Sequence, residues 1–233
     1  MTTADPWAEL LTADRSLLDR TSTAERVADV LRQRIIDGAL APGTRLSEET
    51  AGKALAVSRN TLREAFRLLV HERLLVHEFH RGVFVRVLSA DDVIDLYRIR
   101  RLLETSAVRR AGTAAAELVA AVDRAVTDGE RAAEDERWSD VGTANMRFHE
   151  ALAALAASPR VNETMRQLLA ELRLAFHVMS RPQEFHQPYL ALNRAIADLI
   201  TDGSMEAAAD RLDEYFDEAE TQLVEAYKTY NSH

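Results

Sequence analysis

Two adjacent stretches decide the fold: VSRNTLREAFRLLV at residues 57–70 and LVHEFHRGVFVRV at residues 75–87. In the first stretch, the apolar residues Leu62, Phe66 and Leu69 recur at helical spacing behind Ser58, a residue type that caps helix N-termini. In the second, apolar and polar residues alternate on both sides of a glycine, which predicts a β-hairpin with that glycine in its turn. Together they predict a helix that leads directly into a hairpin.

Two shorter helices are predicted before this pair. Apolar residues at helical spacing predict a first helix from Thr23, and Ser47 then caps a short second helix. The order helix, helix, tight turn, helix, hairpin predicts a winged helix-turn-helix DNA-binding domain over residues 21–88. Residues 1–20 show no clear periodicity and are predicted to form a tail.

Beyond Ser89 the pattern is helical and no further strand is predicted. The predicted helical segments are 90–111, 114–136, 138–157, 160–180, 187–201 and 204–229. They predict an antiparallel bundle over residues 89–230. The predicted fold class is therefore mainly α: three helices and a β-hairpin, followed by an all-α bundle of six or seven helices.

The net charge of −9 is unevenly spread along the chain. Residues 20–88 contain 12 basic and 8 acidic side chains, whereas residues 89–233 contain 16 basic and 26 acidic ones. A locally basic module beside an acidic one is compatible with nucleic-acid binding by the first module.

The chain contains no cysteine, which excludes disulfides, thiolate metal sites and a cysteine nucleophile. A cysteine-free chain suits a reducing compartment. There is also no stretch typical of a signal peptide or of a membrane span. We therefore expect a cytoplasmic protein with no membrane partner.

The third helix carries the predicted DNA contacts. Arg59 and Arg63 can each reach guanine with a planar fork, and Asn60 suits adenine. Arginines four residues apart on a helix are more commonly a solvated face, but the capped polar first turn, the preceding helix and the hairpin favour DNA binding. The residues predicted to contact DNA are Arg45, Ser58, Arg59, Asn60, Thr61, Arg63, Arg81 and Gly82.

Three stretches resemble the winged helix of GntR-family bacterial transcriptional regulators: APGTRLSE at 41–48, VSRNTLREA at 57–65 and RGVFV at 81–85. The helical half, with RRLLE at 100–104 and FHEAL at 148–152, is similar to the FCD-type effector domain of the FadR-like subfamily. The resemblance covers about residues 23–230. It implies the same DNA contacts, and an effector-binding and dimerisation role for residues 89–230. The pair Asn60 and Thr61 stands where the family usually has Thr-Pro, so the base read there is expected to differ.

The resemblance also implies a ligand site in the helical half. In many FadR-like effector domains one aspartate and three histidines hold a divalent metal, and the matching positions here are Asn145, His149, Asn193 and Tyr215. Asparagine is a weak neutral ligand and tyrosine would have to lose a proton, so no metal and no cofactor is expected.

We expect these four residues to line a polar pocket instead, because buried polar groups need partners. Arg100 is the candidate clamp for the carboxylate of a small effector. The alternative reading of His149 alone is a satisfied core histidine, and that of Arg100 is an ordinary salt-bridged arginine. His177 and His186 remain possible metal ligands with His149, although both are expected in a loop.

The sequence therefore predicts a sequence-specific transcriptional regulator, a repressor rather than an activator. It is expected to bind a palindromic operator in double-stranded DNA as a homodimer and to be controlled by a small organic acid. No Glu-x-x-His pair, His-Glu-x-x-His or phosphate-binding loop supports an enzyme. The alternatives left open are a metal-dependent helical-bundle enzyme, a metal-responsive regulator and a helical protein-interaction module, the last of which leaves the arginine-rich helix unexplained.

Overall fold

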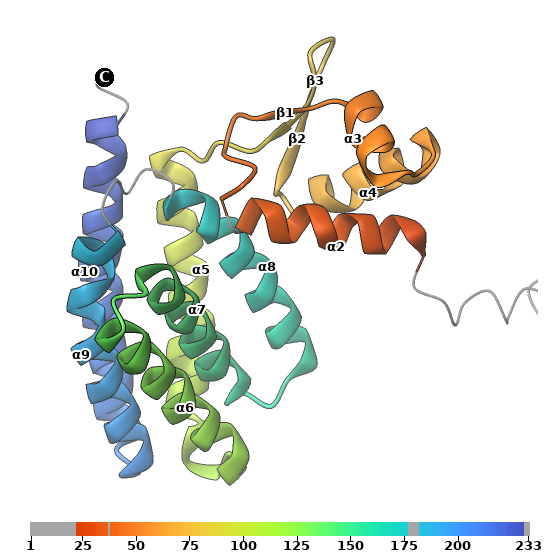
Figure 1. Ribbon diagram of the computed structural model, residues 1–233. Helices are drawn as coiled ribbons and strands as arrows, with labels where there is room; N and C mark the ends of the chain where they lie inside the picture. The colour runs from red at the N-terminus through yellow and green to blue at the C-terminus, as the bar shows by residue number, and fades with distance from the viewer. Residues whose placement is uncertain (1–21, 37, 177–181, 231–233) are drawn as a thin grey trace, which may run out of the picture. The chain divides into compact units, whose positions relative to one another are not determined.

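The computed structural model describes residues 22–36, 38–176 and 182–230 (Figure 1). The predicted tail at residues 1–20 and the candidate ligand His177 lie outside these ranges. Contacts divide the chain into two compact units with the boundary between Arg86 and Val87. We call them unit 1 and unit 2 and describe each by itself.

The described residues of unit 1 form three helices and a small sheet. They are α2 (Thr23–Ile36), α3 (Glu48–Leu55), α4 (Arg59–His71), β1 (Arg45–Leu46), β2 (Leu75–Glu78) and β3 (Gly82–Val85). The predicted caps are confirmed, because the Ser47 side chain accepts from the Thr50 backbone N–H and the Ser58 side chain accepts from that of Thr61.

The hairpin of β2 and β3, which we call the wing, pairs in the predicted antiparallel way, with Leu75 opposite Val85 and Glu78 opposite Gly82. The strand β1 was not predicted. It pairs with β3 and makes the sheet three-stranded in the order β1-β3-β2. A two-residue strand has no periodicity to detect, so only the fold reveals it.

The core of unit 1 fixes the orientation of α4. Its predicted apolar face, formed by Leu62, Phe66 and Leu69, is buried. At the far end of α4, the Arg32 guanidinium of α2 holds the Glu72 carboxylate through Nε at 2.7 Å and Nη2 at 2.6 Å. Because one face of α4 is buried and its C-terminal end is fixed by the Arg32–Glu72 ion pair, its polar side faces solvent.

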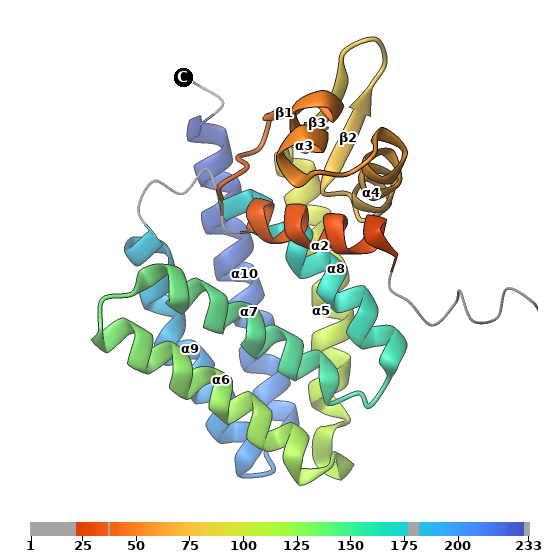
Figure 2. The same ribbon diagram turned by 45° about the vertical axis from the view of Figure 1, so that its right-hand side comes forward.

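Unit 2 is a helical bundle (Figure 2). Its elements are α5 (Ala90–Arg109), the 3-10 helix η2 (Ala111–Thr113), α6 (Ala116–Glu134), α7 (Trp138–Ala154), α8 (Pro159–Ala175), α9 (Pro182–Thr201) and α10 (Met205–Tyr230). Helix α6 packs against α7 and α9, and α5 packs against α10. The predicted fold class is confirmed. None of the described helices combines the length and apolar character that a membrane crossing requires.

The predicted start of α9 is wrong. The helix begins five residues earlier than expected and contains Pro188 in its interior. An internal proline removes one backbone hydrogen bond. The buried rings of Phe185 and Tyr189, which flank this region of the helix, offset that loss.

Candidate functional site

An arginine stripe lies along the exposed side of α4. It consists of Arg59, Arg63 and Arg67, all of them exposed. At the start of the helix the Ser58 hydroxyl lies 2.8 Å from the Thr61 hydroxyl as well as capping the backbone. Ser58 and Thr61 therefore hold the first turn together, and Asn60 is exposed beside them.

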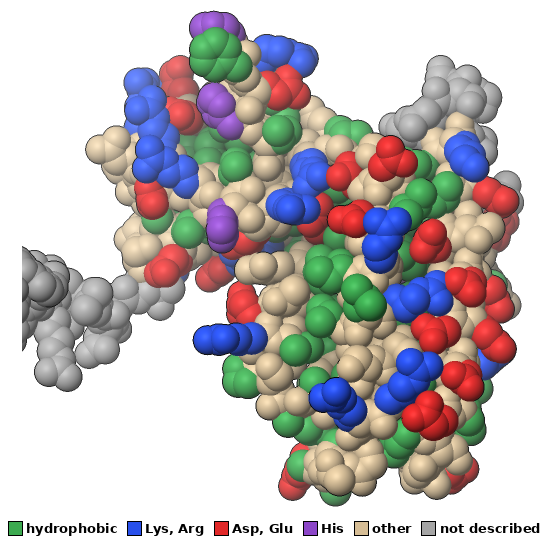
Figure 3. Space-filling view, turned by 180° about the vertical axis from the view of Figure 1, so that it is seen from behind, with side chains coloured by type: hydrophobic (Ala, Val, Ile, Leu, Met, Phe, Trp, Pro, Cys, Tyr) green, Lys and Arg blue, Asp and Glu red, His purple; other side chains and the backbone are tan. Residues whose placement is uncertain are grey.

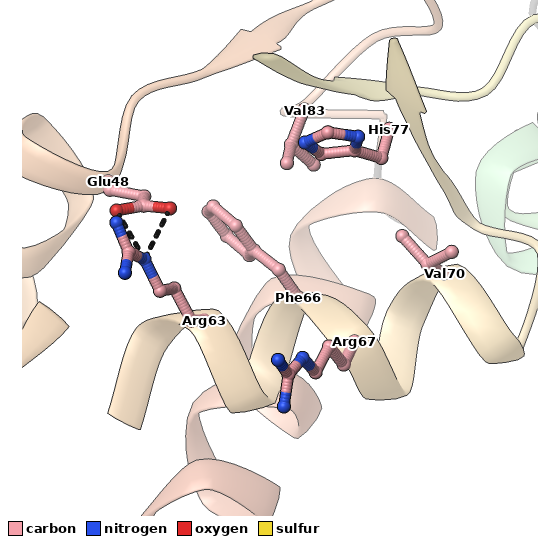
Figure 4. Close-up of a pocket in the computed structure, with 7 residues that line it drawn as sticks. All are labelled: Glu48, Arg63, Phe66, Arg67, Val70, His77 and Val83. Carbon is pink, nitrogen blue, oxygen red and sulfur yellow. Dashed lines mark hydrogen bonds and ion pairs between the residues drawn. The ribbon is translucent and has the colours of Figure 1, made fainter. Parts of the chain in front are cut away.

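A carboxylate from the preceding helix positions one arginine of the stripe. The Nε of Arg63 donates to both carboxylate oxygens of Glu48, each at 3.0 Å (Figure 4). This contact raises the pKa of the Arg63 guanidinium above its ordinary value. The Arg63 side chain remains 60% exposed. Glu48 was not among the predicted site residues, because no local pattern links positions 15 residues apart.

Beside the stripe, α4 and the wing enclose a hollow of about 450 Å³. It is lined by Glu48, Arg63, Phe66, Arg67, Val70, His77 and Val83. In Figure 4, His77 and Val83 approach from the wing and the Phe66 ring lies between them and Arg63. Figure 3 shows a hollow over this unit with hydrophobic side chains in its floor and basic and histidine side chains at its rim.

The predicted wing residues gather at one end of the sheet. Gly82 has a φ of +109°, a conformation that favours glycine, and a Cβ there would lie 3.5 Å from Nε of Arg45. Arg81 forms an ion pair with Glu78 and its guanidinium carbon lies 5.4 Å from the centre of the Phe84 ring. Arg45, Arg81 and Gly82 thus form one local cluster.

In unit 2 a set of polar side chains from four helices meets in the core. We call this set the polar centre; it contains Arg100 and Glu104 of α5, Asn145 and His149 of α7, Asn193 of α9 and Tyr215 of α10. All six are buried. The structure thus brings together the five residues singled out from the sequence and adds Glu104 to them. The four-residue spacing from Arg100 to Glu104 was the available signal for this addition.

The polar centre is a continuous chain of hydrogen bonds. Arg100 Nε donates to one Glu104 oxygen at 3.0 Å, and the other oxygen lies 2.6 Å from His149 Nδ1. His149 Nε2 lies 3.0 Å from the Tyr215 hydroxyl. The Asn145 carbonyl oxygen accepts from Tyr215 at 3.3 Å and from the Asn193 amide at 2.8 Å.

These residues do not fit a divalent metal. The Asn145 oxygen and His149 Nε2, the atoms that would coordinate, are already engaged within the centre. Burial raises the pKa of Tyr215 well above its ordinary value, so its phenolate is not available. In the described ranges, no three His, Cys, Asp or Glu side chains gather in an arrangement that could hold a metal ion.

The members of the polar centre satisfy most of one another's polar atoms. Two atoms of the centre have no partner among the described residues: Arg100 Nη2 and Asn193 Oδ1. The Arg100 guanidinium also lies near the rings of Tyr97, at 5.1 Å, and Phe216, at 5.2 Å. A cavity of about 10 Å³ beside Asn145 and Asn193 has room for about one water molecule.

His186 lies in this region and not in a loop. It belongs to α9, is 6% exposed, and its Nδ1 has no partner among the described residues. Burial, and to a lesser degree Arg173, lowers the pKa of His186 to about 4. A Cβ on Gly142 of α7 would lie 2.7 Å from its Nε2, so this close packing requires glycine. The loop prediction failed because Pro182 starts α9 and does not precede a loop.

Comparison with known proteins gives one family match in each of the two units. Residues 23–85 match the family of bacterial regulatory proteins called gntR, and residues 95–218 match the FCD domain. The chain is 29% identical to the Nta operon transcriptional regulator of Aminobacter aminovorans, over 76% of this chain and 85% of that protein. It is 38% identical to the gluconate operon transcriptional repressor of Bacillus licheniformis, over 48% of this chain and 43% of that protein.

A solved structure supports the same assignment. A GntR transcriptional regulator from Rhodococcus sp. RHA1 is 45% identical, with a TM-score of 0.83, and the match covers 89% of this chain and all of that one. The two matched regions account for most of the described residues of both units. The chain therefore belongs to the GntR family of bacterial transcriptional regulators and carries an FCD domain.

Proposed function

We propose that the chain is a repressor that binds a palindromic operator as a homodimer and releases it when a small organic acid enters unit 2. The observation that carries the DNA-binding part is the exposed arginine stripe on an N-capped helix beside a wing. In this proposal Arg59 and Arg63 each fork onto a guanine and Asn60 pairs with adenine. A repressor role is supported by the name of the gluconate operon relative.

The remaining residues of the proposed DNA interface have positioning roles. Ser58 and Thr61 hold the first turn of α4 so that its free backbone N–H groups face a phosphate. Arg45, Arg81 and Gly82 place the end of the wing against the backbone or the minor groove.

A second copy of the chain is proposed to cover part of α5. Leu102 is 68% exposed on this helix and Ile99 is also exposed. A groove of about 670 Å³ adjoins Leu102 and continues along η2 and the start of α8. An exposed apolar surface of this kind is typical of an interface, and a symmetric dimer matches a palindromic operator.

The effector is proposed to bind at the polar centre. Arg100 is the fixed buried charge, and its unpartnered Nη2 can donate to a carboxylate. His149, Asn145, Asn193 and Tyr215 provide neutral donors and acceptors for the other polar atoms of the acid. These side chains are now hydrogen-bonded to one another, so a bound acid has to replace some of these hydrogen bonds with its own. This exchange gives the two states that coupling to DNA requires.

Selection of bound sequences from a random DNA pool, followed by titration of the selected operator, tests the DNA-binding part. Arg59→Ala or Arg63→Ala should weaken specific binding by roughly 1–3 kcal/mol and relax base preference. Arg131→Ala, which removes an exposed arginine on α6, is the matched control and should have no effect. Parental affinity in both α4 variants would refute the assignment of the recognition helix.

The effector part is tested by titrating organic acids against the protein with and without operator. Linkage requires that an acid which lowers operator affinity by some factor is itself bound more weakly by the same factor when operator is present. The same titration in the presence of a chelator tests the alternative of a metal-responsive regulator. Operator release that depends on added metal would favour that alternative. Turnover of the acid would favour the enzyme alternative.

A further inference from the structure

We propose that the end of the wing is an apolar wedge, in which Phe79 inserts into the minor groove of the operator and unstacks a base step there. This inference rests on the proposed DNA binding by unit 1. It adds a residue that neither the spacing of the arginine stripe nor the family resemblance singles out.

The exposure of Phe79 is the first observation. Its side chain is 81% exposed, more than any other large hydrophobic residue in the described ranges. It contributes little to the core of unit 1, so its hydrophobic surface is available to a partner. An aromatic side chain of this size buries roughly 150–250 Å² when it is covered.

The turn holds Phe79 at a defined position. Glu78 and Gly82 are still paired as strand neighbours, so the connection is only three residues long. The Arg81 backbone N–H donates to the Glu78 carbonyl at 3.0 Å, and His80 adopts a left-handed conformation with φ of +61°. The rings of Phe79 and His80 have centroids 3.9 Å apart. Phe79 is therefore presented at the end of a short, paired hairpin rather than on a long loop. The hairpin formed by β2 and β3 is visible in Figures 1 and 2.

Two basic side chains belong to the same end of the wing. Arg81 follows Phe79 two residues later, and Arg45 lies against Gly82 at the base of the turn. Glu78 is the one nearby acid in the turn and is paired with Arg81. Arginines beside an exposed apolar side chain suit a polyanion that also offers an apolar surface. The minor groove does so, since arginine enters it readily and apolar wedges insert between its base steps.

Insertion has consequences for the operator. Pyrimidine–purine steps such as TA and CA unstack most easily, so they are expected where the wing meets DNA. The duplex should kink towards the major groove at that step. A wing that touched only phosphates would need neither the flexible step nor the kink.

The test uses the whole 233-residue chain and the operator selected from the random pool. The variants are Phe79→Ala, Phe79→Leu and the control Val76→Ala, which removes an exposed apolar side chain of β2 away from the turn. Affinity is measured at fixed salt and over a salt series. DNA bending is measured by energy transfer between labelled ends, and unstacking by 2-aminopurine fluorescence at the step below the wing.

We expect Phe79→Ala to lower operator affinity about tenfold and to reduce the bend, with the salt slope unchanged because no phosphate contact is lost. Phe79→Leu should stay close to the parental protein, and Val76→Ala should match it. The parental complex should show increased 2-aminopurine fluorescence, and Phe79→Ala should not. Unfolding midpoints should agree in all four proteins, since both positions are exposed.

Equal affinity and equal bending in Phe79→Ala and the parental protein would overturn the inference. A change in oligomeric state without any change in DNA binding would also overturn it, because Phe79 would then be a protein contact. If the parental chain selects no DNA sequence, the proposed function fails instead, and the two failures are thus distinguishable.

Discussion

At the scale of single residues, the contact between Glu48 and Arg63 joins a helix outside the arginine stripe to the stripe itself. The carboxylate engages Nε, on the stem side of the guanidinium, and the rest of this exposed group extends beyond it. A guanine is recognised by the two terminal nitrogens of the fork. Glu48 can therefore hold the arginine in one orientation while the fork reads a base.

Glu48→Gln should separate specific from non-specific DNA binding. Removing a negative charge near DNA should strengthen binding to random sequence, whereas the loss of the rigid anchor should weaken discrimination at the guanine. The ratio of operator affinity to random-sequence affinity should fall by up to about tenfold. This loss is part of the roughly 1–3 kcal/mol of base discrimination that an arginine bidentate to guanine provides. Competition titrations with operator and a single-base variant measure it. A uniform gain in affinity for all sequences would show that Glu48 acts only as a charge.

Arg100 and Glu104 form the buried ion pair of the polar centre, and this affects how Arg100 can be tested. Arg100→Met leaves the Glu104 carboxylate without its cation and should cost about 3–5 kcal/mol of unfolding free energy. The double variant Arg100→Met with Glu104→Gln removes both charges and keeps an acceptor for His149, so it should be more stable than the single variant. Urea unfolding checks this order.

The same double variant tests whether Arg100 binds the carboxylate of the effector. It should bind operator like the parental protein and no longer respond to the acid, because the fixed positive charge is gone. A double variant that still releases operator at the parental acid concentration would place the effector elsewhere in unit 2.

At the scale of elements, the sequence was most informative where a local rule sets the structure. The serine caps of α3, α4 and α5 follow from residue type and position, and all three are observed. The strand β1 and the interior proline of α9 were not predicted, since each depends on packing with distant residues. The members of the polar centre other than Glu104 came from matched family positions, whereas the Glu104–His149 contact, which spans 45 residues, required the fold.

The cap of α4 connects helix stability to DNA binding. Ser58→Ala should lower the unfolding free energy by about 1 kcal/mol, because the Thr61 N–H loses its acceptor. Ser58→Asp should keep the cap and the stability, but place a negative charge where a phosphate is proposed to bind. We expect Ser58→Asp to be about as stable as the parental protein and yet to bind operator far more weakly. Similar affinities for the aspartate variant and the parental protein would remove this turn from the DNA interface.

At the scale of the whole molecule, charge and polarity are divided between the two units. The basic residues that face solvent on α4 belong to unit 1, whereas the large acidic excess lies in residues 89–233. Unit 2 also holds two buried histidines, His149 and His186, whose pKa values are lowered, in each case chiefly by burial. Stability in mild acid should therefore depend on these two histidines.

Metal removal should leave the whole molecule unchanged. A ligand that binds only the folded state stabilises it, so chelation lowers the melting temperature of a true metalloprotein. The polar centre offers no set of atoms that suits a divalent metal. Extensive chelation should accordingly change neither the melting temperature nor operator affinity. One equivalent of zinc, nickel or manganese per chain in elemental analysis would contradict this.

His186 provides a pH test with a definite sign. Its pKa is about 4 in the folded protein and 6.5 in the unfolded chain, so between these values the unfolded state binds more protons. The stability that neutral His186 confers is complete above pH 6.5 and is lost as pH falls towards 4. From pH 7 to pH 5 the loss should amount to about 2 kcal/mol of unfolding free energy.

Two variants isolate this contribution. His186→Gln removes the titrating ring, so its unfolding free energy should fall less between pH 7 and pH 5 than that of the parental protein, even if it is less stable at both. Gln183→Ala removes an exposed, uncharged side chain of the same helix and should retain the full parental pH dependence. Urea unfolding at the two pH values measures all three proteins above the range where most carboxylates titrate. An identical pH dependence in His186→Gln and the parental protein would contradict this prediction. It would mean that His186 binds a proton at pH 5 in the folded protein as readily as in the unfolded chain, and hence that water reaches the buried ring.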